Sequence, residues 1–383
     1  MTSRLAVLPL YLAASVEAAG FSGQINLEQR QFIHDGLQGQ DKSQTSLVIE
    51  PEWFTEFQDG DARLTIQPFL RLDSMDDERT HADIRELMYL QLIQDYELRV
   101  GIGKVFWGVT ESIHLVDVIN QTDNVESVDG EQKLGQPMIN LTAVKDWGNV
   151  SGFILPYFRE RTFAGSDGRL RTPLPVNDDA RYESSAEQAH VDWSLRYSNY
   201  FGDWDVGASF FKGTNRDPYF LPGTASLTPY YAQMEQSSVD IQGIFGSWLL
   251  KLEALYRDSL ENHSAAVTGF EYTIVGVFDT YWDLGLIAEY QYDSRDLSLN
   301  QNDLFLGTRF AFNDIDGTEI LFGINQDLDH SQESTGRIEA SARINNNWKW
   351  RANVWWFNTD KLDSPLYFVR KDDFIEVALE YYF

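Results

Sequence analysis

Apolar and polar residues alternate with a period of two along most of this sequence. The last segment is the clearest, because one face of an extended chain over 373–383 carries Ile375, Val377, Leu379, Tyr381 and Phe383. Similar two-faced segments recur at 63–72, 189–198, 204–212, 247–257, 284–293, 337–344 and 348–357. Successive side chains of a β-strand point to opposite faces, so this period predicts strands. Their length, about 9–12 residues, is that of a tilted strand crossing a bilayer.

The connections between these segments alternate between short and long. Short ones fall near 59–61, 94–96, 146–148, 200–203, 246–247, 279–283, 313–317 and 345–347. Long polar ones cover 34–44, 73–80, 106–135, 160–187, 213–230, 258–265, 294–302, 327–335 and 359–372. Membrane barrels keep short turns at one end and long loops at the other, whereas Greek-key sandwiches do not. The rhythm predicts a closed antiparallel transmembrane barrel of about 18 strands, with 16 as the alternative count.

The aromatic residues support a membrane barrel over a soluble sandwich. The sequence holds 24 Phe, 18 Tyr and 11 Trp, although only 43% of it is hydrophobic. Tryptophans sit in or beside five of the short turns, as an interfacial aromatic belt requires: Trp147, Trp204, Trp248, Trp282 and Trp348. A barrel in lipid turns its apolar side chains outward and its polar ones toward a wet interior.

Charge and cysteine content exclude several classes of function. The formal net charge of −29 disfavours nucleic acid as a partner. With no cysteine, thiolate chemistry and cysteine-based metal sites are excluded. The sequence has no Gly-rich phosphate loop, and its six histidines are scattered. We therefore expect no enzyme activity, no cofactor and no resident metal.

The N-terminus predicts a signal peptide over residues 1–18. Arg4 precedes an apolar stretch over 5–14, and a small-residue cleavage site follows at 16–18. The mature barrel is then expected over 19–383.

The last eleven residues, which end in Phe383, resemble the C-terminal targeting strand of bacterial outer-membrane β-barrels. The segment 99–103, followed by Trp107, Gly108 and Asp117, is also similar to a strand and loop of porin-like families. The resemblance implies a Gram-negative outer membrane with periplasmic turns and extracellular loops. It implies assembly by the barrel-assembly machinery, contact with membrane lipid and lipopolysaccharide, and leaves a homotrimer open. The implied function is a channel through which small hydrophilic solutes diffuse passively.

The alternating pattern assigns charged side chains to the interior of the barrel. The expected pore-lining residues are Arg63, Arg71, Arg99, Arg196, Arg309, Arg337, Arg343, Lys349, Arg351, Glu376 and Glu380. Basic and acidic wall residues are close to balanced, so we expect weak ion selectivity that shifts toward cations at low salt. The segment 82–92 does not keep the phase, because Glu86 would face lipid, and this indicates either a β-bulge or an error in the assigned register.

Two long connections are expected to shape the channel. Residues 106–135 carry apolar positions that an exposed loop would not need, so the loop is expected to fold into the lumen and constrict it. Its candidate constriction residues are Glu111, His114, Asp117 and Asp123. Residues 160–187 contain several arginines and are expected to cover the entrance.

Other functions remain open at this point. They are a dedicated uptake or export channel of the envelope, a barrel-embedded enzyme, and a secreted glycan-binding sandwich or propeller.

Overall fold

The computed structural model describes residues 18–383, in which eighteen strands form one closed ring. The expected signal peptide lies outside these residues, apart from Ala18. The strands are β1 (Ala18–Phe32), β2 (Ser43–Phe57), β3 (Ala62–Asp73), β4 (His81–Ile93), β5 (Tyr96–Gly103), β6 (Gln136–Lys145), β7 (Gly148–Leu155), β9 (Asp192–Phe201), β10 (Trp204–Thr214), β13 (Gln233–Phe245), β14 (Trp248–Asp258), β15 (His263–Ile274), β16 (Asp283–Asp293), β17 (Asn302–Ala311), β18 (Glu319–Asp327), β19 (Ser334–Arg343), β20 (Trp348–Asn358) and β21 (Phe374–Tyr382).

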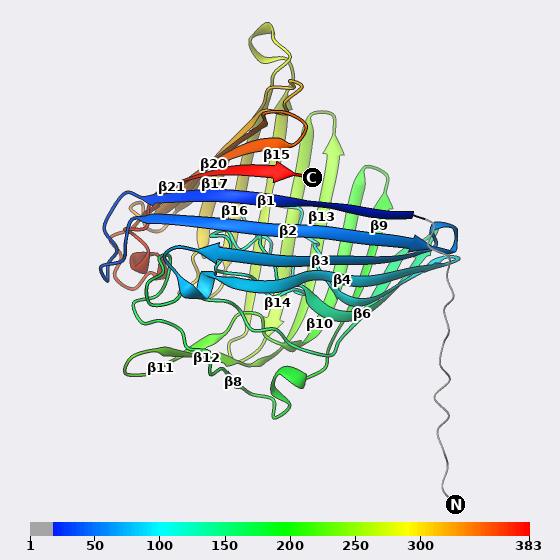
Figure 1. Ribbon diagram of the computed structural model, residues 1–383, viewed down its shortest axis with the longest axis horizontal. Coiled ribbons are helices and arrows are strands. Elements are labelled where there is room, and N and C mark those ends of the chain that lie inside the picture. The colour runs from blue at the N-terminus through cyan, green and yellow to red at the C-terminus, as the bar shows by residue number, and fades with distance from the viewer. Residues whose placement is uncertain (1–17) are drawn as a thin grey trace, which may run out of the picture.

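Each strand of the ring pairs antiparallel with the strands before and after it in the ring. The last strand, β21, pairs with the first, from Gln24↔Tyr382 to Phe32↔Phe374, and this pairing closes the barrel (Figure 1). The predicted all-β barrel of about 18 strands is confirmed. Closure leaves no unpaired strand edge, which a sheet within lipid requires.

The connections differ in length at the two ends of the barrel. The short-turn end includes 58–61, 94–95, 146–147, 202–203, 246–247 and 344–347, and the long-loop end includes 104–135, 156–191 and 359–373. The alternation is not strict, because β14 and β15 join at the long-loop end through residues 259–262 only. Conversely, β15 and β16 join at the short-turn end through residues 275–282.

The two faces of the wall differ in polarity. Mid-strand Val100, Leu306 and Val377 point outward and are 40%, 47% and 52% exposed. Glu253 and Glu289 point inward and are fully buried. Outward aromatic pairs lie near the short turns, among them Trp204 with Phe245, Trp248 with Tyr272, and Trp348 with Tyr381. The outer surface is therefore apolar with an aromatic rim, and the inner surface is polar.

A β-bulge interrupts the pairing of β3 with β4. Gln67 pairs with Glu86, whereas Pro68 pairs with Ile84, so Arg85 is an extra residue in β4. The bulge brings Glu86 to the inward face beside Met88 and keeps Arg85 inward and buried. Of the two explanations for the phase break, the structure shows the β-bulge.

The remaining elements are small and lie in the connections. A second sheet contains β8 (Arg181–Tyr182), β11 (Tyr219–Pro222) and β12 (Leu227–Tyr231). Five 3₁₀ turns are η1 (Gln58–Gly60), η2 (Asp77–Arg79), η3 (Glu187–Ala189), η4 (Val277–Asp279) and η5 (Pro365–Phe368). Within residues 18–383, no helix has both the length and the apolar character needed to cross a membrane.

Candidate functional site

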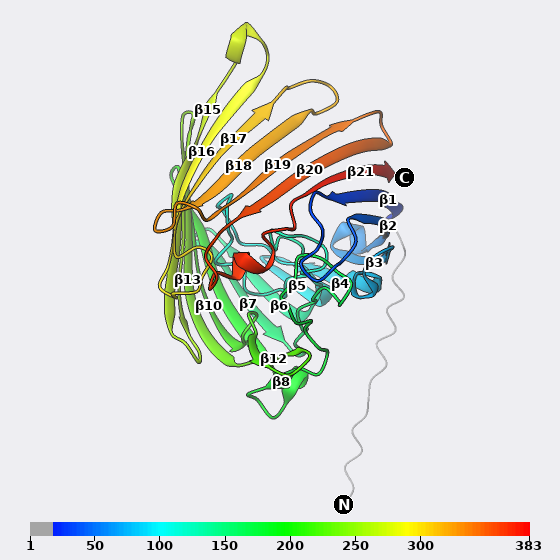
Figure 2. The same ribbon diagram turned by 90° about the vertical axis from the view of Figure 1, so that its left-hand side faces the viewer.

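Residues 104–135, which join β5 to β6, run through the interior of the ring (Figure 2). We call this segment the inner loop. Its first fixed point is Glu253 on β14. One oxygen of Glu253 accepts hydrogen bonds from the backbone N–H of Val109 (2.7 Å) and Thr110 (3.1 Å) and from the Thr110 hydroxyl (2.8 Å). The other oxygen accepts the N–H of Val116 at 3.2 Å.

Glu289 on β16 holds the next two residues of the inner loop. Its carboxylate accepts the N–H of Glu111 at 2.8 Å, the N–H of Ser112 at 2.8 Å and the Ser112 hydroxyl at 2.6 Å. Hydrogen bonds to a carboxylate are about twice as strong as neutral ones. The two glutamates therefore fasten the inner loop to the wall opposite its own strands.

The apolar residues of the inner loop fill part of the interior. Val116, Val118 and Ile119 are buried with inward apolar side chains of β4, β6, β7, β10 and β13, which are Met88, Met138, Phe153, Leu155, Phe211 and Met234. This packing excludes water, because protein interiors are close-packed. The β4–β13 side of the interior is therefore closed by the inner loop.

The tip of the inner loop bridges to the other side of the ring. Glu126 forms an ion pair with Arg71 on β3 at 2.6 Å, and Asp129 lies 3.8 Å from Arg337 on β19. The tip thus crosses the arc that runs from β19 through β20, β21, β1 and β2 to β3. The space between this arc and the tip is not filled by the apolar cluster.

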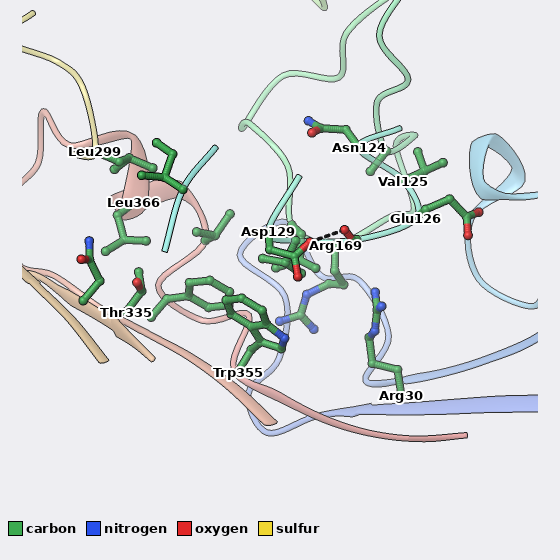
Figure 3. Close-up of a pocket in the computed structure, with 18 of the residues that line it drawn as sticks. Arg30, Asn124, Val125, Glu126, Asp129, Arg169, Leu299, Thr335, Trp355 and Leu366 are labelled. Atoms are coloured by element: carbon green, nitrogen blue, oxygen red, sulfur yellow. Dashed lines mark hydrogen bonds between the residues drawn. The ribbon is translucent and has the colours of Figure 1, made fainter. Parts of the chain in front are cut away.

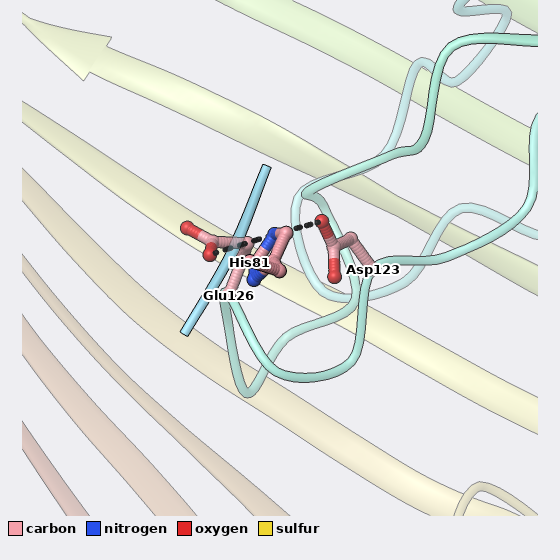
Figure 4. Close-up of side chains that lie close together, drawn as sticks. All are labelled: His81, Asp123 and Glu126. Atoms are coloured by element: carbon pink, nitrogen blue, oxygen red, sulfur yellow. Dashed lines mark ion pairs between the residues drawn. The ribbon is translucent and has the colours of Figure 1, made fainter. Parts of the chain in front are cut away.

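His81, Asp123 and Glu126 place one ligand atom each within 4.8 Å of one another (Figure 4). His81 Nε2 is 3.7 Å from Asp123 and 3.6 Å from Glu126. However, Arg85 lies 2.7 Å from Asp123, and Arg71 pairs with Glu126. Because guanidinium groups already neutralise both carboxylates, we interpret the cluster as an ion-pair network that holds the inner loop.

Four ionisable groups of the inner loop have shifted pKa values, among them Asp123 and His114, which contact residues of the wall. Burial raises the pKa of Asp123, but His81 and Arg85 act against it more strongly and lower it to about 2. Burial lowers the pKa of His114, but the Glu253 carboxylate at 3.8 Å and the charge of Glu131 raise it above its ordinary value. Asp123 is therefore held ionised, and the protonated form of His114 is favoured.

Three cavities meet at the tip of the inner loop. The outer cavity, about 840 Å³, is lined among others by Arg257, His263, Asp293 and Arg295 near the long-loop end. The aromatic pocket, about 340 Å³, lies beside Trp355 and Phe357. The acidic cavity, about 360 Å³, lies between the tip and the β19–β3 arc. Val128 and Asp129 border all three.

The acidic cavity carries a strong excess of negative charge. Three arginines line it, namely Arg30, Arg71 and Arg351. Eight carboxylates line it, namely Glu28, Glu50, Glu126, Asp129, Glu131, Glu339, Glu376 and Glu380. Several acids pair with these arginines, but within residues 18–383 no lysine, arginine or histidine nitrogen lies within 4.0 Å of the Glu50 carboxylate. The potential in this cavity therefore favours cations.

The structure places the predicted pore-lining residues on the inward face, most of them in ion pairs. Arg351 binds Glu28, Glu376 and Glu380 at 3.0–3.5 Å. The other pairs are Arg71 with Glu28, Arg63 with Glu52, Arg99 with Glu97, Arg196 with Asp240, Arg309 with Glu319, and Arg337 with Glu339. Arg343 is exposed at the short-turn end, opposite Lys349, which in turn lies opposite Glu380.

The predicted constriction residues lie on the inner loop but do not line the acidic cavity. Glu111 is bound by Arg309 at 2.7 Å and Arg337 at 3.1 Å, and Asp117 and Asp123 are buried. His114 and Asp117 border the outer cavity instead. The acids at the tip, Glu126, Asp129 and Glu131, were not singled out from the sequence. Their position in the acidic run 123–131 was the only available signal.

The connection 156–191 lies across the long-loop end. Arg159 binds Asp83 on β4 at 2.9 Å. Arg169 binds Asp372 at 2.7 Å and donates to the backbone oxygens of His34 and Lys371. The segment thus ties its own side of the barrel to the loops that flank β1 and β21, and it covers part of that end.

These features define a class of protein. A closed ring of antiparallel strands with an apolar exterior and a polar interior, holding a folded-in loop, is the fold of a porin-like outer-membrane β-barrel.

Comparison with known proteins found similar structures but no similar sequences. No protein-family model matches this sequence, and no curated protein matches it significantly. Among solved structures, a mutant of the Rh. blastica porin has a TM-score of 0.48 and 12% identity, covering 96% of this chain and 100% of its own. The trimer form of OmpT from Vibrio cholerae has a TM-score of 0.47 and 10% identity, covering 96% and 99%. Similarities at this level carry no argument about function.

Proposed function

We propose that the protein is an outer-membrane channel for passive diffusion of small hydrophilic solutes, with a preference for cations. The carrying observation is the acidic cavity between the inner loop and the β19–β3 arc. On the opposite side the apolar cluster fills part of the interior, so we assign the route of solutes to the acidic side. Eighteen-stranded barrels are wide enough to leave a water-filled path beside such a loop.

The inner loop changes the balance of charge that was expected from the wall residues alone. The wall alone is close to balanced in charge, but the inner loop adds Glu126, Asp129 and Glu131 to the acidic cavity, and Asp129 borders all three cavities. Fixed charges at a narrow, low-dielectric site act on permeating ions more strongly than charges in exposed loops. We therefore expect cation preference to persist at physiological salt.

Planar-bilayer recording of the purified full chain tests both parts of the proposal. We expect stepwise conductance and a reversal potential of cation-selective sign in a tenfold KCl gradient. In the variant Glu50→Gln/Glu131→Gln, the reversal potential should move toward zero. The matched control Asp178→Asn/Asp363→Asn removes the same charge from exposed loop positions and should move it much less.

Two results would contradict the proposal. Absence of conductance steps from folded protein would mean that the interior is plugged. An unchanged reversal potential in Glu50→Gln/Glu131→Gln would mean that ions do not pass the acidic cavity.

The same proposal includes a location in the outer membrane, contacts with lipid, lipopolysaccharide and the assembly machinery, and a homotrimeric state. It also includes the absence of enzyme activity.

A further inference from the structure

The aromatic pocket has a flat apolar wall. Trp355 and Phe357 stack with ring centroids 6.3 Å apart and an interplanar angle of 13°. The apolar lining also includes Val128, Leu170, Leu299, Leu366 and Val369. Figure 3 shows Trp355, Leu299 and Leu366 among the residues that line the pocket. This wall suits an apolar or aromatic group of a ligand.

The arginines that line the same pocket offer no free positive charge. Arg30 pairs with Glu376 at 2.7 Å, Arg79 with Asp73 at 3.2 Å, and Arg169 with Asp372 at 2.7 Å. An anionic ligand would have to displace one of these buried pairs, which is costly.

The carboxylate of Asp303, by contrast, is buried without a cation. Asp303 is 3% exposed and accepts only the Asn325 amide at 3.1 Å and the backbone N–H of Asn302 at 3.2 Å. Within residues 18–383, no lysine, arginine or histidine nitrogen lies within 4.0 Å of it. Glu333, also in the lining, accepts only the side-chain hydroxyls of Thr359 and Ser364. In the described part of the chain, Asp303 and Glu333 are therefore acidic side chains of the pocket that have no cationic partner.

Two amide oxygens near Asp303 also have no hydrogen-bond donor. Gln291 lies opposite Asp303 in the β16–β17 register, is 2% exposed, and its Oε1 is buried without a partner. The Oδ1 atom of Asn325 is also buried without a hydrogen-bond partner. Both residues line a side cavity of about 110 Å³ that shares Asn300, Thr335 and Trp355 with the aromatic pocket. Buried acceptors without donors are rare and costly, so this group of oxygens fits a ligand that brings donors.

We propose that the aromatic pocket binds a primary organic ammonium ion with an aromatic or apolar body. The ammonium group has three donors and a positive charge, which Asp303, Gln291 and Asn325 would satisfy. The body would lie against Trp355 and Phe357. The pocket adjoins the outer cavity through Leu299 and Asn300, which line both. Binding does not require that the barrel conducts; only the view of this ion as a permeating solute rests on the proposed function.

Calorimetric titration of the folded full chain in detergent tests the site. The probe is 2-phenylethylammonium, and the matched anion is phenylacetate. We expect saturable binding of the amine and none of the acid. In Asp303→Asn, which keeps the shape but removes the charge, the dissociation constant should rise about tenfold or more. Asp363→Asn, which removes an exposed charge, should change it less than twofold.

Heat-modifiable gel migration shows whether Asp303→Asn folds. If it folds poorly, the comparison of 2-phenylethylammonium with phenylacetate on the natural protein still tests the site. Equal binding of phenylacetate, unchanged affinity in folded Asp303→Asn, or displacement of the amine by Ca²⁺ at equal ionic strength would overturn the site. Because the titration needs no membrane potential, a barrel that fails to conduct leaves the result intact. If the natural barrel conducts but does not bind the amine, the proposed site is rejected and the proposed channel function is not.

Discussion

Buried carboxylates act at the residue scale as fixed acceptors that hold the inner loop. Glu253, Glu289 and Asp123 are all 0% exposed, yet each is surrounded by N–H groups, hydroxyls or guanidinium groups. Removing the partners of a buried charge is strongly destabilising. The position of the loop therefore depends on the ionisation of these groups.

The low pKa of Asp123 predicts an acid-dependent loosening of the inner loop. Because its folded pKa of about 2 lies below the ordinary value near 4, its contribution is fully present above about pH 4. It is lost as the pH falls from there through 2, which amounts to roughly 2 kcal/mol. Hydrogen exchange of residues 104–135, corrected for intrinsic rates, should rise over this range while β-strand protection persists.

The variant Asp123→Asn is the control for this prediction. It should exchange faster at neutral pH and show a smaller further rise on acidification than the natural protein, because the glutamate anchors remain. A loop in the natural protein that keeps full protection at pH 2 would contradict the role of Asp123.

At the element scale, the bulge in β4 sets which side chains reach the interior. Arg85 and Met88 are three residues apart, so they would face opposite sides of a regular strand. The extra residue of the bulge lets Arg85 bind Asp123 while Met88 also packs inward. A shift of one residue in a strand exchanges its two faces. The bulge therefore reconciles the loop anchor with the apolar cluster.

Deleting a residue from β4 should have opposite results at two nearby positions. Deletion of Glu86 removes the bulge and leaves Arg85 opposite Gln67, with all other pairs unchanged, so the barrel should fold. Deletion of Tyr89 forces Glu86 and Met88 outward if the ladder closes regularly, so the yield of heat-modifiable barrel should fall several-fold. Equal folding yields of the two deletions in lipid vesicles would refute this reading of β4.

Most strands were predictable from sequence because they keep a period of two, but some connections were not predictable. Residues 258–265 are polar and were expected to form a long loop, whereas β15 begins at His263. Polar residues inside a barrel face water or ion partners, so polarity does not end a strand there. The entry of the inner loop into the lumen followed from its apolar positions. The residues that anchor the loop could not be predicted in this way, because Glu111 and Glu289 are 178 residues apart in the sequence.

At the scale of the whole molecule, the barrel is inverted relative to a soluble domain. Apolar side chains such as Leu306 lie outside, and charged networks lie inside. The outward face is stable only in contact with hydrocarbon.

A charge introduced on the outward face should therefore be far more costly than one introduced inside. Leu306→Arg, at the middle of β17, should lower the free energy of unfolding in lipid vesicles by about 2–4 kcal/mol. Ser341→Arg, which faces inward across from Glu319 on β18, should change it by less than about 1 kcal/mol. Urea midpoints measured by tryptophan fluorescence compare the two, and equal losses would argue against a lipid-facing exterior.

The anchoring of the inner loop also constrains the order of assembly. The loop lies between β5 and β6, but its seats on β14 and β16 come much later in the chain. Until those strands are in the sheet, Val116, Val118 and Ile119 have no complete cavity to enter. We therefore expect the inner loop to take its final position only after β14 and β16 have joined the sheet, which places this step late in the assembly of the barrel.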